Sequence, residues 1–229
     1  MKKLSLFSCS FLLVLSFAVS ANAGLMGYYY NLPSTHPDMQ YHITGLDQGY
    51  IENALTGPMP TLTTYGNTKI QQWDWWDPAY LTFSRLDSDA DLQSNFTSHW
   101  FPIPNSEPGD PYHFAVHWEG QFYVAEDKSY TYSMGSDDDS WLFIDNELVL
   151  DLGGVHALQH ANYAVSLTKG YHDIDVFFAE RHTVQSGFQL NFFSDLEPGP
   201  AAPSPEPATL VLLGAGIAGL AGFRKRFRK

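Results

Sequence analysis

The sequence predicts an all-β domain with the architecture of an antiparallel β-sandwich. Apolar and polar residues alternate in short segments after residue 111, and turn residues recur about every 8 to 12 residues. No segment shows the periodicity of an amphipathic helix. Residues 24–197 provide enough chain for one such domain with a substantial core.

The expected strands begin at residues 25–30 and resume after a loop-rich stretch with many Pro and Gly. Asp145-Asn146-Glu147 and Thr168-Lys169-Gly170 are typical of tight turns between strands. The remaining strands are expected at residues 113–118, 121–124, 130–134, 141–144, 148–150, 163–167, 172–179 and 188–192.

Residues 1–23 have the organisation of a secretory signal peptide. Lys2 and Lys3 precede an apolar run at residues 11–19, which is shorter than the roughly 20 residues of a membrane span. Signal peptidase is expected to cut after Ala23. Because most of the apolar run follows Cys9, we do not expect lipidation there, and the processed chain would contain no cysteine and no disulfide.

The C-terminal segment combines a Pro-rich linker at residues 198–207, an apolar stretch that starts at residue 208, and a basic cluster at residues 224–229. This order resembles the PEP-CTERM sorting signal. The resemblance implies a transmembrane helix within residues 208–229, transient anchoring in the inner membrane, and cleavage by an exosortase near Glu206. The protein would then reach the cell surface or extracellular matrix. An ordinary anchor helix is the alternative.

The charge of the chain excludes one class of partner. The formal net charge is −13, and seven of the 12 Lys and Arg lie in the two terminal segments, which leaves five against all 25 Asp and Glu. A net charge of −20 repels phosphate backbones, so nucleic-acid binding is not expected. Such acidity either keeps an exported protein soluble or supplies oxygen ligands for calcium.

Asp137-Asp138-Asp139 is the segment with the clearest chemical potential. Three adjacent carboxylates repel one another unless a cation or hydrogen-bond donors lie among them. We expect these residues at a loop tip between two strands. From the residues alone, both a calcium site and a solvated acidic turn are possible.

Several segments in the same order resemble the protective antigen 14 domain, a β-sandwich of toxins, glycosidases and adhesins. The resemblance implies the lectin-like sandwich of that family. Residues 137–144, 151–156 and 177–182 look most like its fibro-slime branch. Residues 40–105 match poorly and are expected to be an insertion. The matching segments are residues 24–30, 118–124, 136–145 and 167–172.

The resemblance also implies a calcium ion held by Asp137 and Asp138, often through a cis peptide bond, with sugar hydroxyls completing its shell. Asp139, which stands where the family more often has Gly, is expected as a further ligand. Further ligands would come from the loop before the last strand, where Glu180, Gln185 and Ser186 carry oxygens. That loop lacks the Asn of the best-known adhesin lectins.

Several other side chains are candidates for either a functional or a structural role. His156 and His182 either donate to sugar hydroxyls or are structural. Trp73, Trp75 and Trp76 form either a sugar-stacking platform or part of a core. The nine His show no helical metal spacing, and Asp173 and Asp175 point the same way on one strand, without the arrangement of glycosidase carboxylates.

The function expected from the sequence is a non-enzymatic, exported module that binds exopolysaccharide or surface glycans with the help of calcium. The alternative is a structural surface or matrix protein in which calcium only stabilises the fold. A hydrolase of matrix polysaccharide is a third possibility, for which no nucleophile motif is present.

Overall fold

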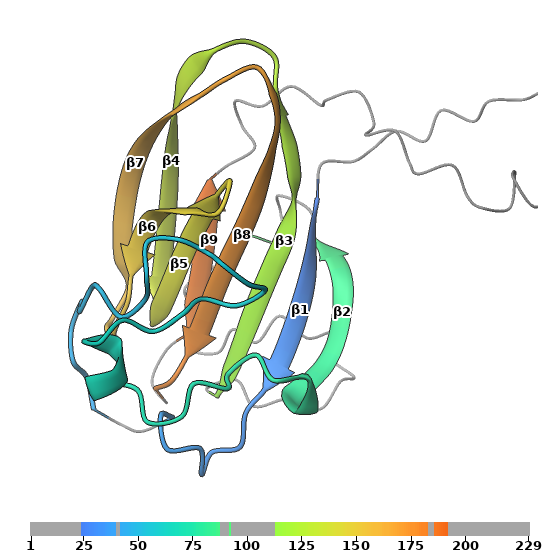
Figure 1. Ribbon diagram of the computed structural model, residues 1–229. Coiled ribbons are helices and arrows are strands. Elements are labelled where there is room, and N and C mark those ends of the chain that lie inside the picture. The colour runs from blue at the N-terminus through green and yellow to red at the C-terminus, as the bar shows by residue number, and fades with distance from the viewer. Residues whose placement is uncertain (1–23, 40–41, 88–91, 93–112, 183–185, 192–229) are drawn as a thin grey trace, which may run out of the picture. The chain divides into compact units, whose positions relative to one another are not determined.

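The computed structural model describes residues 24–39, 42–87, 92, 113–182 and 186–191, which fold as two antiparallel sheets (Figure 1). The larger sheet has the order β2-β1-β3-β8-β5-β6, and the smaller one has the order β7-β4-β9. The expected two-sheet sandwich is therefore confirmed. The strands are β1 (Leu25–Asn31), β2 (Leu81–Asp87), β3 (Phe114–Val124), β4 (Lys128–Asp137), β5 (Asp139–Ile144), β6 (Glu147–Leu152), β7 (Gln159–Leu167), β8 (Gly170–Glu180) and β9 (Gly187–Asn191).

The helical elements in this part of the chain are two short 3-10 turns, η1 (Gly66–Thr68) and η2 (Pro78–Tyr80). Within the described residues, no helix has the length and apolar character needed to span a membrane. The expected signal peptide and the expected C-terminal span lie outside those residues.

Two of the expected strands are one. Residues 114–118 and 121–124 belong to β3, which pairs without interruption with β8, with Gly120 opposite Ile174. A Cβ atom on Gly120 would lie 2.8 Å from Leu25 Cδ2. The glycine therefore allows close packing against β1 and does not mark a turn.

The main core lies between the two sheets. Alternate residues of the central strands point into it, because successive side chains of a strand face opposite sides of the sheet. Trp118 of β3 stacks on Phe188 of β9 with ring centroids 4.8 Å apart, and Phe178 of β8 contacts the same ring. These contacts join the six-stranded sheet to the three-stranded one.

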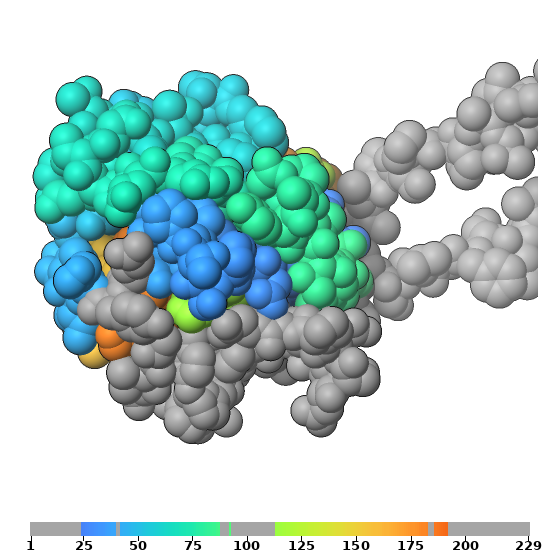
Figure 2. All heavy atoms as spheres, turned by 90° about the horizontal axis from the view of Figure 1, so that it is seen from below, coloured from blue at the N-terminus to red at the C-terminus, as the bar shows by residue number. Residues whose placement is uncertain are grey.

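A second core covers the outer face of the six-stranded sheet. Phe143 and Phe177, from the central strands, pack there with Trp75, Trp76 and residues from the segment 42–80. This segment crosses the sheet in Figure 1 and lies as a cyan-to-green layer against the N-terminal residues in Figure 2. Because both faces of the sheet are covered, β5 is buried along its whole length.

The poorly matching region therefore has two structural roles in its described part. Residues 42–80 form the outer layer, and β2 extends the sheet by pairing with β1. Asp87 at the end of β2 is completely buried and accepts hydrogen bonds from Tyr29 Oη and Trp118 Nε1. Residues 88–91 and 93–112 lie outside the description.

Candidate functional site

The three consecutive aspartates lie where the chain passes from one sheet to the other. Asp137 ends β4 in the small sheet, Asp139 begins β5 in the large sheet, and Asp138 lies between them. The peptide bond between Asp137 and Asp138 is cis, as the resemblance implies. The side chains are 6%, 1% and 0% exposed, so the expectation of a loop tip or solvated turn is wrong. A single-residue connection between two packed sheets leaves no room for a projecting loop.

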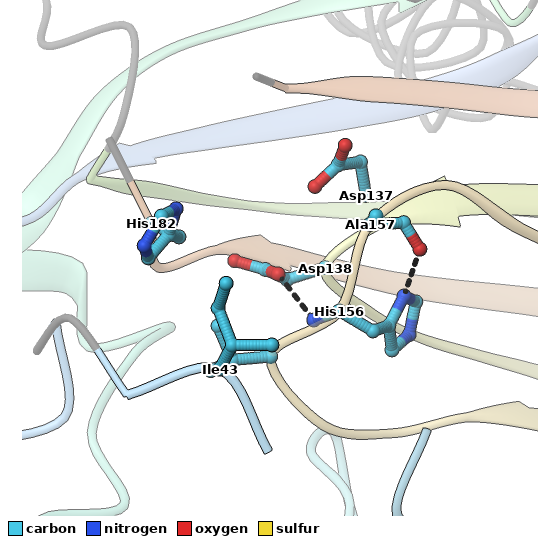
Figure 3. Close-up of a pocket in the computed structure, with 7 residues that line it drawn as sticks. Ile43, Asp137, Asp138, His156, Ala157 and His182 are labelled. Atoms are coloured by element: carbon cyan, nitrogen blue, oxygen red, sulfur yellow. Dashed lines mark hydrogen bonds between the residues drawn. The ribbon is translucent and has the colours of Figure 1, made fainter. Parts of the chain in front are cut away.

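Asp137, Asp138 and Glu180 form one buried group of carboxylates. Each offers an oxygen within 4.8 Å of the others. Asp138 is held by two backbone N–H groups. Its Oδ1 lies 2.7 Å from His156 N (Figure 3), and its Oδ2 lies 2.9 Å from Arg181 N. Glu180 Oε1 accepts a hydrogen bond from His182 N at 3.0 Å. The ends of β4 and β8 therefore fix the group from both sheets.

The protein balances the charge of this group only in part, through Arg181 and nearby backbone N–H groups. Burial, reinforced by the neighbouring charge of Asp138, raises the pKa of Asp137 to about 6. Burial and Asp139 raise the pKa of Asp138 to about 6, and burial with Asp138 holds the pKa of Glu180 well above its usual value. Among the described residues, Glu180 Oε2 has no hydrogen-bonding partner. Asp138 raises the pKa of Glu180, either through charge repulsion or through a proton shared by the two carboxyl groups. Three oxygen donors with unbalanced charge suit a hard divalent cation.

Asp139, which we expected among the ligands, is used differently. Its Oδ1 accepts a hydrogen bond from Gly154 N at 2.6 Å, and its Oδ2 lies 2.7 Å from Arg181 Nε. The Arg181 guanidinium also lies 4.9 Å from the ring centre of Trp75. Asp139 thus has a charged partner in the protein, unlike Asp138, whose two oxygens accept from backbone N–H groups, and we do not retain Asp139 as a ligand. The position of Asp139 next to Asp138 in the sequence did not reveal this difference. Asp139 begins β5, and its side chain faces Gly154 and Arg181.

The expected sugar-binding residues have different environments. The ring nitrogens of His156 both lie 3.0 Å from backbone carbonyl oxygens, those of Ala157 and Leu152, so the imidazole is structural and only the backbone N–H faces the carboxylates. His182 is partly exposed and its side chain borders the pocket. Ser186 is completely buried and does not line the pocket, whereas Gln185 lies outside the described residues.

A pocket of about 380 Å³, including its open mouth, lies beside Asp137 and Asp138 (Figure 3). Its wall includes Ile43, whose side chain is 69% exposed, and Val155. Sequence analysis did not identify either residue as part of a site. Ile43 reaches it because Thr44 N donates to Val155 O at 2.9 Å, a contact across 111 positions that no local pattern indicates.

The remaining candidates are structural pairs on the sheet surface. Asp173 accepts a hydrogen bond from Gln121 Nε2 at 2.8 Å, and Asp175 lies 2.8 Å from His117 Nε2. His117, Glu119 and Asp175 offer ligand atoms within 4.8 Å of one another across β3 and β8. Spacing within one element could not reveal this cluster because its members come from two strands.

Comparison with known proteins agrees with the fold and the order of segments. Residues 22–203 match the PA14 domain, so the chain belongs to the PA14 domain family. Residues 205–226 match the PEP-CTERM protein-sorting motif, which implies export and surface sorting. Both resemblances expected from the sequence are confirmed.

Individual relatives are distant. Protein psiR of Dictyostelium discoideum is 26% identical over 203 residues, which cover 71% of this chain and 20% of psiR. Similarity to the psi proteins agrees with the expected fibro-slime branch. Among solved structures, the PA14 domain of the antifreeze protein MpAFP is 14% identical with a TM-score of 0.48, covering 79% of this chain and 87% of that one. The PA14 sugar-binding domain from an RTX adhesin is 14% identical with a TM-score of 0.46, covering 74% and 88%.

Proposed function

We propose that this protein is a non-enzymatic surface module that binds calcium through Asp137, Asp138 and Glu180 and binds carbohydrate in the adjoining pocket. The observation that carries the proposal is the convergence of three buried carboxylates, one with an unpartnered oxygen, at the edge of that pocket. Oxygen donors of this kind suit calcium. Membership of a family with sugar-binding relatives supports the same function.

The residues of the site would have different roles in binding calcium and sugar. Asp138, fixed by two backbone N–H groups, holds its carboxylate in place before any ligand arrives. Bound calcium would supply open coordination positions for vicinal sugar hydroxyls. His182 offers a polar contact, and Ile43 and Val155 offer an apolar surface for the ring carbons of a sugar.

We also propose the route and the setting. Signal peptidase cuts after Ala23, the C-terminal helix anchors the chain transiently in the inner membrane, and an exosortase cuts near Glu206. The domain then acts at the cell surface or in the extracellular matrix, where exopolysaccharide is the partner. Weak single sites on many copies gain strength there through avidity.

A structural role for calcium is the second candidate. The ligand Asp138 accepts a hydrogen bond from Arg181 N, and Arg181 connects through Asp139 to the loop at Gly154. A cation at this point would therefore stabilise the junction between the sheets without any sugar. The two functions differ in whether a glycan is retained.

Thermal unfolding of residues 24–197 with and without millimolar calcium, after chelation, tests the metal site. We expect calcium to raise the midpoint, and Asp137→Asn with Asp138→Asn to abolish the shift. Asp127→Asn, at the opposite end of β4, is the control for loss of a carboxylate. Retention of calcium-loaded protein on a glycan array then separates the two candidates, and an unchanged calcium shift in the double variant refutes the site.

A further inference from the structure

We propose that a second pocket, next to the carboxylate group, binds an anionic substituent of a sugar, a carboxylate or a sulfate ester. This inference rests on the proposed carbohydrate binding, because it identifies the polysaccharide as an acidic one. The pocket has a volume of about 460 Å³, including its open mouth, and its lining includes His42, Thr44, Tyr50, Lys69, Gln71 and Arg181.

The two pockets are neighbours, because residues of one short segment line both of them. Ile43 lines the pocket beside the carboxylates, whereas His42 and Thr44 line the second pocket, as expected for an extended segment whose side chains alternate. Val155, which accepts hydrogen bonds from this segment, borders both. Consecutive sugar residues of one polymer could therefore occupy the two pockets.

The second pocket concentrates positive charge in an acidic domain. Residues 24–197 contain five Lys and Arg against 24 Asp and Glu, yet Lys69 and Arg181 both line this pocket. Lys69 Nζ lies 3.2 Å from Asp47 Oδ2, and the Lys69 side chain remains 37% exposed. It is thus available to a ligand that enters from solvent.

Asp38 is the one carboxylate in this lining, and its oxygens are already used. Oδ1 accepts a hydrogen bond from Gln71 N at 2.7 Å. Oδ2 accepts from Gln72 N at 3.0 Å and from Trp75 Nε1 at 3.2 Å. Three donors therefore stabilise this charge locally, which weakens its repulsion of an incoming anion.

Arg181 supplies the observation that points to a ligand. Its side chain is 7% exposed, and its Nε is paired with Asp139. Its Nη2 is buried and has no hydrogen-bonding partner among the described residues. A buried, unsatisfied N–H group is costly, and a guanidinium pairs well with planar carboxylates and with sulfate. Because Arg181 lines the pocket, an anion that enters there and reaches Nη2 would offset that cost.

The test uses the calcium-free domain, so it does not depend on the metal site. Both cores lie within the described part of residues 24–197, which are used with chelator present. Binding of methyl glucuronoside, glucose 6-sulfate and methyl glucoside is followed by NMR. We expect both anions to shift the signals of His42, Lys69 and Arg181, and the neutral glucoside to shift none of them. The two anions also show whether carboxylate or sulfate is preferred.

Lys69→Ala should weaken binding of the anions at least about fivefold, because it removes the exposed cation. Lys128→Ala removes the same charge at the start of β4 and should leave binding unchanged. Arg181→Lys keeps the charge but loses the guanidinium, and should also weaken binding. Equal losses in Lys69→Ala and Lys128→Ala, or equal binding of glucoside and glucuronoside, would overturn the proposal. If only the calcium site were wrong, the unfolding assay would show no calcium shift, and the anion binding measured with chelator would not change.

Discussion

At the scale of single residues, neighbours in the sequence have opposite roles. Asp138 has 1% exposure and lies beside two other carboxylates, Asp137 and Glu180, whereas Asp139 has 0% exposure and is paired with the Arg181 guanidinium. The difference arises because successive residues at a strand start face different surroundings. Substitutions that remove one carboxylate should therefore have opposite effects on stability.

Glu180→Gln removes a buried acid whose charged form is disfavoured by burial and by Asp138, and it keeps the shape of the side chain. We expect the calcium-free protein to gain stability and calcium to bind more weakly. Asp139→Asn leaves the buried Arg181 without its charged partner and should cost about 3–5 kcal/mol, with or without calcium. Urea unfolding of both variants after chelation checks this. Destabilisation of the calcium-free protein by Glu180→Gln would contradict the assignment.

The raised pKa values predict an unusual pH dependence. With pKa values of about 6 for Asp137 and Asp138, the folded protein retains protons that the unfolded chain releases between about pH 4 and pH 6. This contribution to the free energy of unfolding is present at low pH and is lost as the pH rises through about 6. Calcium binds the ionised carboxylates, so its stabilisation should be larger at about pH 7.5 than at about pH 5. Thermal unfolding at both pH values, with and without calcium, measures this stabilisation. Equal calcium-induced shifts in the unfolding midpoint at the two pH values would disagree with this explanation.

At the scale of elements, the β5–β6 hairpin shows how a turn is selected. Asp145 and Asn146 have φ values of 51° and 67°, the left-handed region that a tight hairpin turn requires. Asp145 also accepts a hydrogen bond from Asp173 N at 3.0 Å and lies 2.6 Å from His172 Nδ1. A glycine substitution would therefore relieve backbone strain at both turn positions, but only at Asp145 would it also remove carboxylate contacts.

Asn146→Gly should stabilise the protein by up to about 1 kcal/mol, because glycine adopts a positive φ without strain. Asp145→Gly relieves the same strain but loses both carboxylate contacts, so it should destabilise. Denaturant midpoints of the two variants give the comparison. A destabilising Asn146→Gly would mean that the Asn side chain has a role beyond the turn.

At the scale of the whole molecule, the six-stranded sheet has a core on each face. The outer core depends on the segment 42–80, whose Trp75 is completely buried against Trp76 and Trp141. Residues far from the expected motifs therefore contribute to the stability of the fold and to the walls of both pockets. The tryptophans belong to a core, and the reading as an exposed sugar platform is not supported for Trp75 or Trp76.

Trp75→Ala should cost about 3–5 kcal/mol of folding free energy, because it opens a large cavity and removes the stacking surface of Arg181. Trp73→Ala, at a partly exposed position of the same cluster, should cost less. Equilibrium unfolding of the two variants tests the ranking. Loss of glycan binding in Trp75→Ala without loss of stability would favour the platform.

The sequence by itself predicted the sandwich, most of the strands and the family, because alternation and turn residues are local and the family segments keep their order. It named Asp137, Asp138 and Glu180 as candidate ligands only through the family resemblance, since Glu180 is distant from the aspartates in the sequence. It did not predict the continuous β3, the burial of the aspartates or the separate role of Asp139. Only the tertiary structure decided these, along with the outer core and the two pockets. Each depends on contacts between distant segments, such as residues 42–44 with Val155, and such contacts leave no period in the sequence.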